Sequence, residues 1–391
     1  MKRVRFGIIG CGVIGSSHAR QIVQAKAGDF RLAAVADIRP EMAERLGKEH
    51  GVPWFKDGYA LMDSGLVDAV IIGTPHYHHP PLTIAAARRG LHVLCEKPVA
   101  VSVGPARAAV AECKKRRVAM GVMFQQRNRP EMRKMKDMVQ AGAVGEIFRV
   151  QMICSSWYRT QFYYDSGAWR GTWLGEGGGV LINQAPHSLD LFQWIGGMPR
   201  RVVATVDTRH HKIEVENTAN AVLDYGKGKT GYIYATTAEA PGLEQMMVCG
   251  DKGTLVAEGG KLRLAKLNVL SIRKHLLGAK AGMRPPECTW RDVPLPNIRG
   301  SHINIIRAFV GHVLHGRPLA ATGQEGINEL ELSNAIYIAG YKNKPVELPV
   351  NAAEMERLLT ELARKHGTGK SENIRRRANA ELKKLLGKYP A

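Results

Sequence analysis

The chain is 391 residues long, which allows two domains of the usual ~100–200 residues each. Its hydrophobic content of 45% is ordinary for a globular protein, and no apolar run approaches the ~18 residues of a membrane span. Lysine and arginine total 56 against 35 acidic residues, which gives a net charge of +21. Because no nucleic-acid-binding motif accompanies this charge, the composition excludes a membrane span and gives no support to specific nucleic-acid recognition.

Part of the positive charge is local. Residues 261–300 carry nine lysines and arginines against two acids, and residues 370–391 carry seven against two. Such segments can attract an anionic partner or substrate, but a solvated basic surface is the interpretation that we favour. Six cysteines are scattered without paired spacing, which indicates reduced thiols and a cytoplasmic protein rather than a disulfide framework.

Residues 1–125 alternate between short apolar runs and stretches with helical spacing. Continuous apolar strands separated by helices are typical of a parallel sheet covered on both faces, so we predict a doubly wound α/β Rossmann domain over residues 1–128. The predicted strands are Val4–Ile9, Leu32–Ala36, Ala69–Ile72, His92–Cys95 and Val118–Met123, and the predicted helices are Ile14–Ala25, Pro40–Gly47, Pro80–Arg89 and Val103–Arg116.

Beyond residue 145 the pattern changes to successive strands joined by short turns such as YGKGKTG and CGDKGT. This pattern predicts a mostly antiparallel open sheet in an α+β domain over residues 129–391. The predicted strands are Glu146–Ser155, Arg200–Asp207, Asn217–Asp224, Thr230–Thr236, Gln245–Cys249, Thr254–Ala257 and Lys261–Ala265, and the predicted helices are Val180–Ile195, Ile303–His315 and Gly326–Tyr341. Residues 267–300 have the weakest pattern and are predicted to form a long basic loop.

The chain ends in an amphipathic pattern with a basic face. Its apolar helical face consists of Ile374, Ala378, Leu382, Leu385 and Leu386. A helix of this kind can lie on a membrane surface, but docking on its own domain or on another subunit is the interpretation that we favour.

The sequence GCGVIG at residues 10–15 directly follows the first predicted strand and opens a helix. In this strand–turn–helix context the motif is typical of dinucleotide binding. Gly10 allows the tight turn, Gly12 lets the backbone approach a pyrophosphate, and Gly15 lets helix and sheet pack closely. The helix N-terminus offers unpaired N–H groups to the phosphates.

Asp37 follows the second predicted strand, 22 residues after Gly15 and close to the ~20-residue spacing expected for an acid that binds the adenosine ribose hydroxyls. Because a carboxylate repels a 2′-phosphate, we predict NAD rather than NADP as the cofactor. Arg39, two residues further on, could reach a phosphate and keeps NADP as the alternative.

Lys97 lies in HVLCEKPVA, where a predicted buried strand gives way to a loop. Ligands of open α/β sheets bind outside the carboxyl ends of the strands, so Glu96 and Lys97 are predicted to face the nicotinamide end of the cofactor. Partial burial and a cationic ring nearby should lower the lysine pKa toward values that suit proton transfer. Pro98 should restrict the backbone of Lys97 to an extended conformation.

The chain resembles the Gfo/Idh/MocA family of glucose–fructose oxidoreductases and inositol dehydrogenases. The resemblance covers nearly the whole chain and includes the glycine loop, GTPHYHHPPLTIAAARRGLHVLCEKPVA, RPEMRKMKDMVQAGAVGEI, GEGGGVLINQAPHSLDLFQWIGG and HINIIRAFVGHVLHGRPLAATGQEGINELELSNAIY. It implies an NAD(P)-dependent oxidation or reduction at a carbinol carbon, usually of a sugar or cyclitol, by a homodimer or homotetramer.

The resemblance also implies a catalytic pair. The family's lysine falls on Lys97, and its Asp-x-x-x-His falls on Asn183 and His187. A four-residue step places Asn183 and His187 on one face of the predicted helix, where His187 can take a hydroxyl proton while a hydride leaves the same carbon. Asparagine in place of aspartate adds no charge, so it should leave His187 a weaker base. Lys97 should then take the larger part in the proton transfer.

Motif and resemblance together predict the remaining site residues. The predicted cofactor residues are Gly10, Gly12, Val13, Ile14, Gly15, Asp37, Ile38, Arg39, Thr74, Pro75, His79, Glu96, Lys97, Gln125, Arg127, Trp169 and Arg170. The predicted substrate residues are Lys97, Tyr158, Tyr164, Trp169, Asn183, His187 and His302. Tyr163 and Trp173 could also stack on a sugar ring, and Arg159 and Arg170 could bind hydroxyls or an anionic group.

Other chemistries have less support. His76, His78 and His79 crowd one turn without a carboxylate at ligand spacing, so we expect no metal site. No Gly-x-Ser-x-Gly elbow indicates a serine hydrolase. Two alternatives stay open: a redox-assisted glycoside-cleaving enzyme that recycles tightly bound NAD, and a non-catalytic NAD-binding regulator that uses the basic tail.

Overall fold

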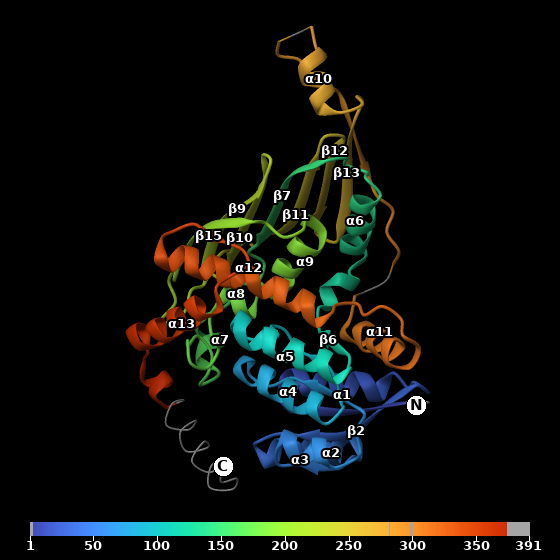
Figure 1. Ribbon diagram of the computed structural model, residues 1–391, viewed down its shortest axis with the longest axis vertical. Helices are drawn as coiled ribbons and strands as arrows, with labels where there is room; N and C mark the ends of the chain where they lie inside the picture. The colour runs from blue at the N-terminus through green and yellow to red at the C-terminus, as the bar shows by residue number, and fades with distance from the viewer. Residues whose placement is uncertain (1–2, 281, 298–299, 374–391) are drawn as a thin grey trace.

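The computed structural model describes residues 3–280, 282–297 and 300–373, so the predicted terminal helix over residues 374–391 lies outside the described part. A six-stranded sheet has the order β3-β2-β1-β4-β5-β6, and a nine-stranded sheet has the order β14-β13-β12-β11-β7-β10-β9-β8-β15. Figure 1 shows the smaller sheet and its helices at the bottom of the view and the larger sheet above them. Both predicted fold classes are confirmed.

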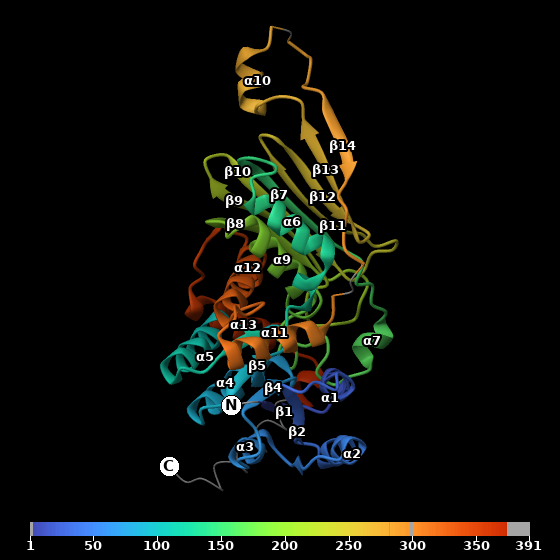
Figure 2. The ribbon, with the colours of Figure 1, turned by 90° about the vertical axis from the view of Figure 1, so that its right-hand side faces the viewer.

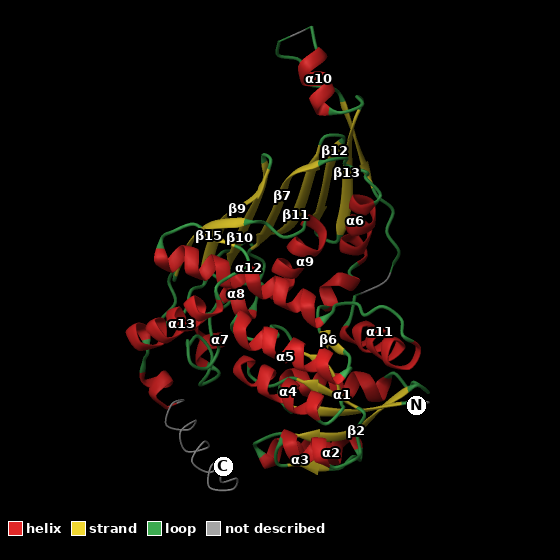
Figure 3. Ribbon diagram, in the orientation of Figure 1, coloured by secondary structure: helices red, strands yellow, loops and turns green. Residues whose placement is uncertain are grey.

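The six-stranded sheet is parallel throughout, with helices on both faces (Figure 3). Its strands are β1 (Val4–Ile9), β2 (Phe30–Ala36), β3 (Trp54–Phe55), β4 (Ala69–Ile72), β5 (His92–Cys95) and β6 (Met120–Val122). Its helices are α1 (Val13–Gln24), α2 (Pro40–His50), α3 (Gly58–Asp63), α4 (His79–Arg88) and α5 (Val103–Arg116). All but β3 and α3, which are short, were predicted. Every residue of β4 is buried, as a central strand covered on both faces requires.

The nine-stranded sheet is antiparallel except for the pair β7–β10. Its strands are β7 (Ile147–Cys154), β8 (Arg201–Asp207), β9 (Thr218–Gly226), β10 (Lys229–Thr236), β11 (Glu244–Gly250), β12 (Gly253–Glu258), β13 (Lys261–Leu267), β14 (Cys288–Asp292) and β15 (Val346–Glu347). Contacts place α6 (Pro130–Gln140), α9 (Pro186–Gly196) and α12 (Gly323–Lys342) against this sheet (Figure 2).

The other face of the nine-stranded sheet is not covered by any helix of the described residues. Side chains in register across it run from β8 to β12. They are Val203, Val222, Tyr232, Gln151, Met247 and Val256. Val203 and Val222 are 50% and 57% exposed, which is unusual for valines that pair in the middle of adjacent strands.

Two predictions about local structure were wrong. Residues 267–300 do not form only a loop, because α10 (Ile272–Gly278) and β14 lie within them and β14 pairs with β13. Together they form an arm that projects from the sheet (Figure 1). The predicted helix Val180–Ile195 is interrupted: α8 (Val180–Asn183) ends before Pro186, which starts α9. Proline suits a first helical position because it lacks an N–H group.

One helix from the second half of the chain completes the first sheet's core. In α11 (His302–His315), the Phe309 ring lies 6.1 Å from the Phe6 ring of β1, and Ile303 N donates to Gln21 Oε1 of α1. The remaining helices are α7 (Gln161–Asp165) and α13 (Ala352–His366). No helix in the described ranges is long and apolar enough to cross a bilayer. The domain boundary at residue 128 stays a prediction.

Candidate active site

The glycine loop between β1 and α1 has the geometry of a phosphate cradle. Gly10 has φ +98°, and a Cβ on it would lie 2.6 Å from the Gly73 carbonyl oxygen. A Cβ on Gly15 would lie 1.8 Å from the Gly10 carbonyl oxygen, so both positions require glycine. A Cβ on Gly12 would meet nothing within 4 Å, and Val13 is 91% exposed. The backbone therefore faces open space at the helix N-terminus, which fits the pyrophosphate of NAD.

Asp37 is fixed at the end of β2 beside this loop. Its Oδ2 accepts a hydrogen bond from Cys11 N at 2.8 Å, and its Oδ1 accepts one from Arg39 N at 2.9 Å. The Arg39 guanidinium lies 3.6 Å from the same carboxylate, while Ile38 is largely exposed. This arrangement holds a carboxylate next to the glycine loop, where it fits ribose hydroxyls.

His79 connects the two loops that follow β4 and β5. Its Nδ1 lies 2.7 Å from the Pro98 carbonyl oxygen, and its Nε2 lies 2.8 Å from the Thr74 carbonyl oxygen. Because the ring is buried, His79 acts from behind the loops rather than at the surface. Thr74 Oγ1 is buried and has no hydrogen-bond partner among the described residues, whereas Pro75 is exposed at the start of the turn.

Lys97 follows β5 at the carboxyl end of the sheet, and its Nζ donates a hydrogen bond to the Asn183 carbonyl oxygen at 2.6 Å. Burial lowers the pKa of Lys97 and the charge of Arg159 lowers it further, while nearby carboxyls such as Glu96 oppose the shift. Burial alone would raise the pKa of Glu96, but the hydrogen bond and charge of His18, at 2.8 Å, bring it to about 2. The pKa of Lys97 is therefore lowered, in the direction predicted from the sequence.

His187 lies in the first turn of α9, where its Nε2 is 3.1 Å from Gln125 Nε2. Gln125 belongs to the short turn after β6, so the contact joins the two halves of the chain. Nδ1 of His187 is buried without a partner among the described residues. Burial lowers the pKa of His187 to about 3, and the charge of Lys97 contributes. His187 is therefore a weak base, as expected, although burial rather than the asparagine is the main cause.

Asn183 does not share a helix face with His187 as predicted, because α8 ends at Asn183. Its Nδ2 donates to the Glu176 carboxylate and, at 3.2 Å, to the Tyr163 hydroxyl. Its backbone carbonyl, rather than its side chain, accepts from Lys97. Asn183 therefore links Lys97 to the loop before α8.

Glu176 is an acid that the sequence-based prediction did not include. Its side chain is buried, and Oε2 accepts a hydrogen bond from Gly171 N at 2.6 Å. Burial raises the pKa of Glu176 to about 7, although these hydrogen bonds oppose the shift. A carboxyl group is thus present beside position 183 even though position 183 itself is an asparagine. The sequence feature that could have indicated Glu176 is that it is the sole acidic residue in residues 166–189.

Glu329 of α12 is a second buried acid that was not predicted. Neither carboxyl oxygen has a hydrogen-bond partner among the described residues. Burial raises its pKa well above the usual value, and the nearby charge of Asp190 contributes, while that of Lys97 acts in the opposite direction. Burial therefore favours the uncharged form of the Glu329 carboxyl.

Several predicted residues lie away from the open side of the site. Arg127 is buried, donates to Asp190 at 2.8 and 2.6 Å, and donates to Glu325 at 2.6 Å, so its guanidinium is fully engaged in joining α9 and α12. Tyr164 is buried with its hydroxyl 2.8 Å from Thr237 Oγ1. The structure thus places both residues in supporting positions rather than in open contact with a ligand.

Two other predicted ligand residues contact histidine rings, and a third is exposed. The Trp169 ring lies 5.9 Å from the His76 ring, and Tyr158 is 53% exposed. The His302 ring lies 5.3 Å from the His18 ring, which itself contacts Glu96. Trp169 and His302, which are far apart in the sequence, therefore both contact histidines of the first domain.

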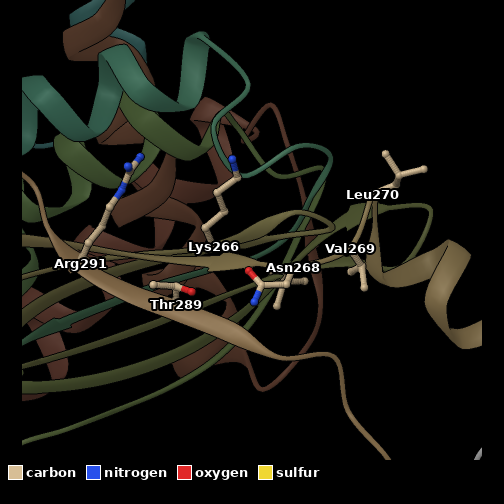
Figure 4. Close-up of a pocket in the computed structure, with 7 residues that line it drawn as sticks. Lys266, Asn268, Val269, Leu270, Thr289 and Arg291 are labelled. Carbon is tan, nitrogen blue, oxygen red and sulfur yellow. The ribbon is translucent and has the colours of Figure 1, made fainter.

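A surface cavity of about 520 Å³ lies elsewhere, at the foot of the arm. Figure 4 shows Lys266 and Arg291 pointing to the same side of β13 and β14, with Asn268 and Thr289 nearby. None of the residues that line this cavity belongs to the predicted site. Among the described residues, no group of three or more side chains is arranged to hold a metal ion.

Comparisons with known proteins agree with this geometry. Residues 4–124 match the model of an oxidoreductase family with an NAD-binding Rossmann fold, and residues 132–256 match the GFO/IDH/MocA C-terminal domain. D-apiose dehydrogenase of Paraburkholderia graminis is 25% identical over 90% of this chain and 92% of its own. Myo-inositol 2-dehydrogenase of Thermotoga maritima is 27% identical over 85% of this chain and 95% of its own length.

A solved structure has the same architecture over almost its full length. The WlbA dehydrogenase from Bordetella pertussis, in complex with NADH and UDP-GlcNAcA, superimposes with a TM-score of 0.75 at 27% identity, covering 89% of this chain and 100% of that one. The glycine cradle, the carboxylate at the end of β2 and both domain matches lead to one conclusion. The chain belongs to the GFO/IDH/MocA family and is an NAD-dependent oxidoreductase.

Proposed function

We propose that this protein transfers a hydride between a carbinol carbon of a sugar, glycoside or cyclitol and the nicotinamide of NAD, with Lys97 and His187 as the acid–base pair. The observation that carries the proposal is the convergence of these two side chains from different halves of the chain. Lys97 contacts Asn183 of α8 and His187 contacts Gln125 after β6, so each reaches across the junction. Sugar and cyclitol dehydrogenases among the relatives support the substrate class.

The lowered pKa values assign the roles. Burial lowers the pKa of Lys97, which favours its neutral form and helps it take the hydroxyl proton of the substrate. His187 stays neutral because burial holds its pKa at about 3, so it can accept a hydrogen bond from the hydroxyl and take part with Lys97 in the proton transfer. When bound, NAD supplies the acceptor for the hydride. In the reverse direction Lys97 returns the proton to the alkoxide oxygen.

The test is NADH formation, followed by absorbance, with a panel of sugars, cyclitols and glycosides. Lys97→Ala should lower kcat roughly 10²–10⁴-fold, the usual contribution of a positioned acid–base group, and His187→Ala should lower it by at least tenfold. Lys134→Ala and His315→Ala are matched controls, because both residues are exposed and lie outside the site.

Turnover by both site variants at the wild-type rate would contradict the assignment. Product analysis separates the redox-assisted alternative, which would release cleaved glycoside without accumulating NADH. A protein that binds NAD but turns over none of these compounds would instead be a regulator.

We also propose that the uncovered face of the nine-stranded sheet joins copies of this chain into a dimer or tetramer. The support is the mostly apolar row that includes Val203, Val222 and Met247, which no helix within the described ranges covers. A cytoplasmic location is supported by six free cysteines, all within the described ranges.

A further inference from the structure

Two arginines flank one tyrosine ring beside the candidate site. The guanidinium carbon of Arg159 lies 4.7 Å from the centre of the Tyr163 ring, and that of Arg170 lies 4.3 Å from it. Arg159 also lies over Trp157 at 5.6 Å, and Arg170 lies over Trp169 at 4.6 Å. Aromatic stacking fixes both guanidinium groups in place at half-buried positions.

Neither arginine forms an ion pair in the part of the chain that the structure describes, although the charge of Arg170 is near enough to act on the buried carboxyl of Glu176. Arg129, by contrast, pairs with both Glu131 and Glu244. Arg159 donates to the Tyr158 carbonyl oxygen at 3.0 Å, and its Nε is buried without a partner. Arg170 donates to the Tyr163 hydroxyl. Within the described residues both half-buried guanidinium groups lack an ion pair, and an anionic ligand would offset part of the cost of burying them.

This pair of arginines lies next to the reacting groups. The Tyr163 hydroxyl accepts from Asn183 Nδ2 at 3.2 Å, and the Asn183 carbonyl accepts from Lys97 Nζ at 2.6 Å. The charge of Arg159 is near enough to act on Lys97. An anionic group held by the arginines would therefore belong to the same molecule whose hydroxyl meets Lys97.

We propose that Arg159 and Arg170 bind a carboxylate of the substrate, so that the substrate is a sugar acid, free or as a nucleotide ester. The inference rests on the proposed function and narrows its substrate class. Planar guanidinium groups match the two oxygens of a carboxylate in a bidentate arrangement. The partner is the substrate rather than the cofactor phosphates, because the glycine cradle at residues 10–15 already provides for those.

The test compares matched pairs that differ by one carboxylate: glucuronate with glucose, galacturonate with galactose, and UDP-GlcNAcA with UDP-GlcNAc. We expect kcat/KM of the wild type to favour the acid at least tenfold in at least one pair. Arg159→Met and Arg170→Met should each reduce this preference roughly 10- to 100-fold, through KM rather than kcat, since charged hydrogen bonds usually contribute that much. Arg159→Lys should recover part of it, and Arg364→Met, an exposed control on α13, should retain it.

The inference would be overturned if the wild type turned over the neutral sugars as efficiently as their acids. It would also be overturned if the preference for the acid survived both substitutions. Glucose 6-phosphate preferred over glucuronate would overturn the carboxylate assignment. Calorimetric titration of the three acids into protein saturated with NADH separates this inference from the proposed function. Binding of an acid that Arg159→Met abolishes supports the arginine subsite even without turnover, and absence of binding to the wild type refutes it.

Discussion

Three neighbouring ionisable groups in the site hold different charges because their partners differ. Glu96 stays ionised because His18 contacts its carboxylate, and its pKa is about 2. Burial lowers the pKa of Lys97 below its ordinary value. His187 is neutral because burial lowers its pKa to about 3. The site therefore combines an ionised carboxylate with a lysine whose charged form is disfavoured by burial.

Glu176 gives a prediction about pH and stability. Burial raises its pKa from 4.5 to about 7, so the folded state holds its proton more tightly than the unfolded chain does. The protonated Glu176 side chain therefore adds to the free energy of unfolding below pH 4.5, and this contribution is lost as the pH rises through 7. Glutamine cannot ionise, so Glu176→Gln should gain roughly 1–3 kcal/mol in unfolding free energy relative to wild type between pH 5 and pH 8.

Urea denaturation of both proteins at the two pH values measures this change. Glu44→Gln, on the exposed side of α2, is the control and should show no such trend. A difference between Glu176→Gln and wild type that is the same at both pH values would mean that the carboxyl is already ionised at pH 5.

At the scale of elements, continuous burial made the first sheet predictable, and its absence hid other parts. The strands β1, β4 and β5 are almost entirely buried, so their apolar runs stand out. All five residues of β14 are exposed, so no periodicity distinguishes it from a loop. Over Val180–Ile195 nearly every residue is buried, which conceals the break before Pro186.

The same reasoning applies to the site. Lys97 and the glycine loop follow buried strands, so their positions could be inferred from strand order and the switch point of the sheet. The role of Glu176 depends on the turn that brings it to Asn183, which no local pattern encodes. For Arg127, the pattern indicated proximity to the cofactor but not the two carboxylates that engage it.

The glycine loop gives a prediction at this scale. Gly12→Ala should weaken NAD binding at least tenfold without a change in unfolding free energy, because the added methyl group points into open space that the pyrophosphate needs. Gly15→Ala should instead destabilise the fold by ~1–3 kcal/mol or more, because its Cβ would overlap the Gly10 carbonyl.

Calorimetric titration with NAD and urea denaturation distinguish the two effects. Gly28→Ala, where a Cβ also meets no neighbour, is the control outside the loop. If Gly12→Ala bound NAD as the wild type does, the pyrophosphate would have to lie elsewhere.

At the scale of the whole molecule, the larger sheet has one face packed on helices and another that no helix of the described part of the chain covers. Val222→Lys places a charge in the middle of the apolar row and should convert the proposed oligomer to a smaller species. Light scattering after size-exclusion chromatography gives the mass. Val23→Lys, on the exposed side of α1, is the control and should leave the mass unchanged. A wild type that is monomeric at micromolar concentration would contradict the proposal.

The packing of α11 on β1 also bears on how the protein is made. On the ribosome, Phe6 leaves the exit tunnel long before Phe309 is made, yet the two rings meet in one core. The nucleotide-binding half must therefore wait, with part of its interior uncovered, until α11 has been translated. A premature stop that removes α11 would leave that interior as a target for chaperones and proteases even though every residue of the glycine loop had been translated.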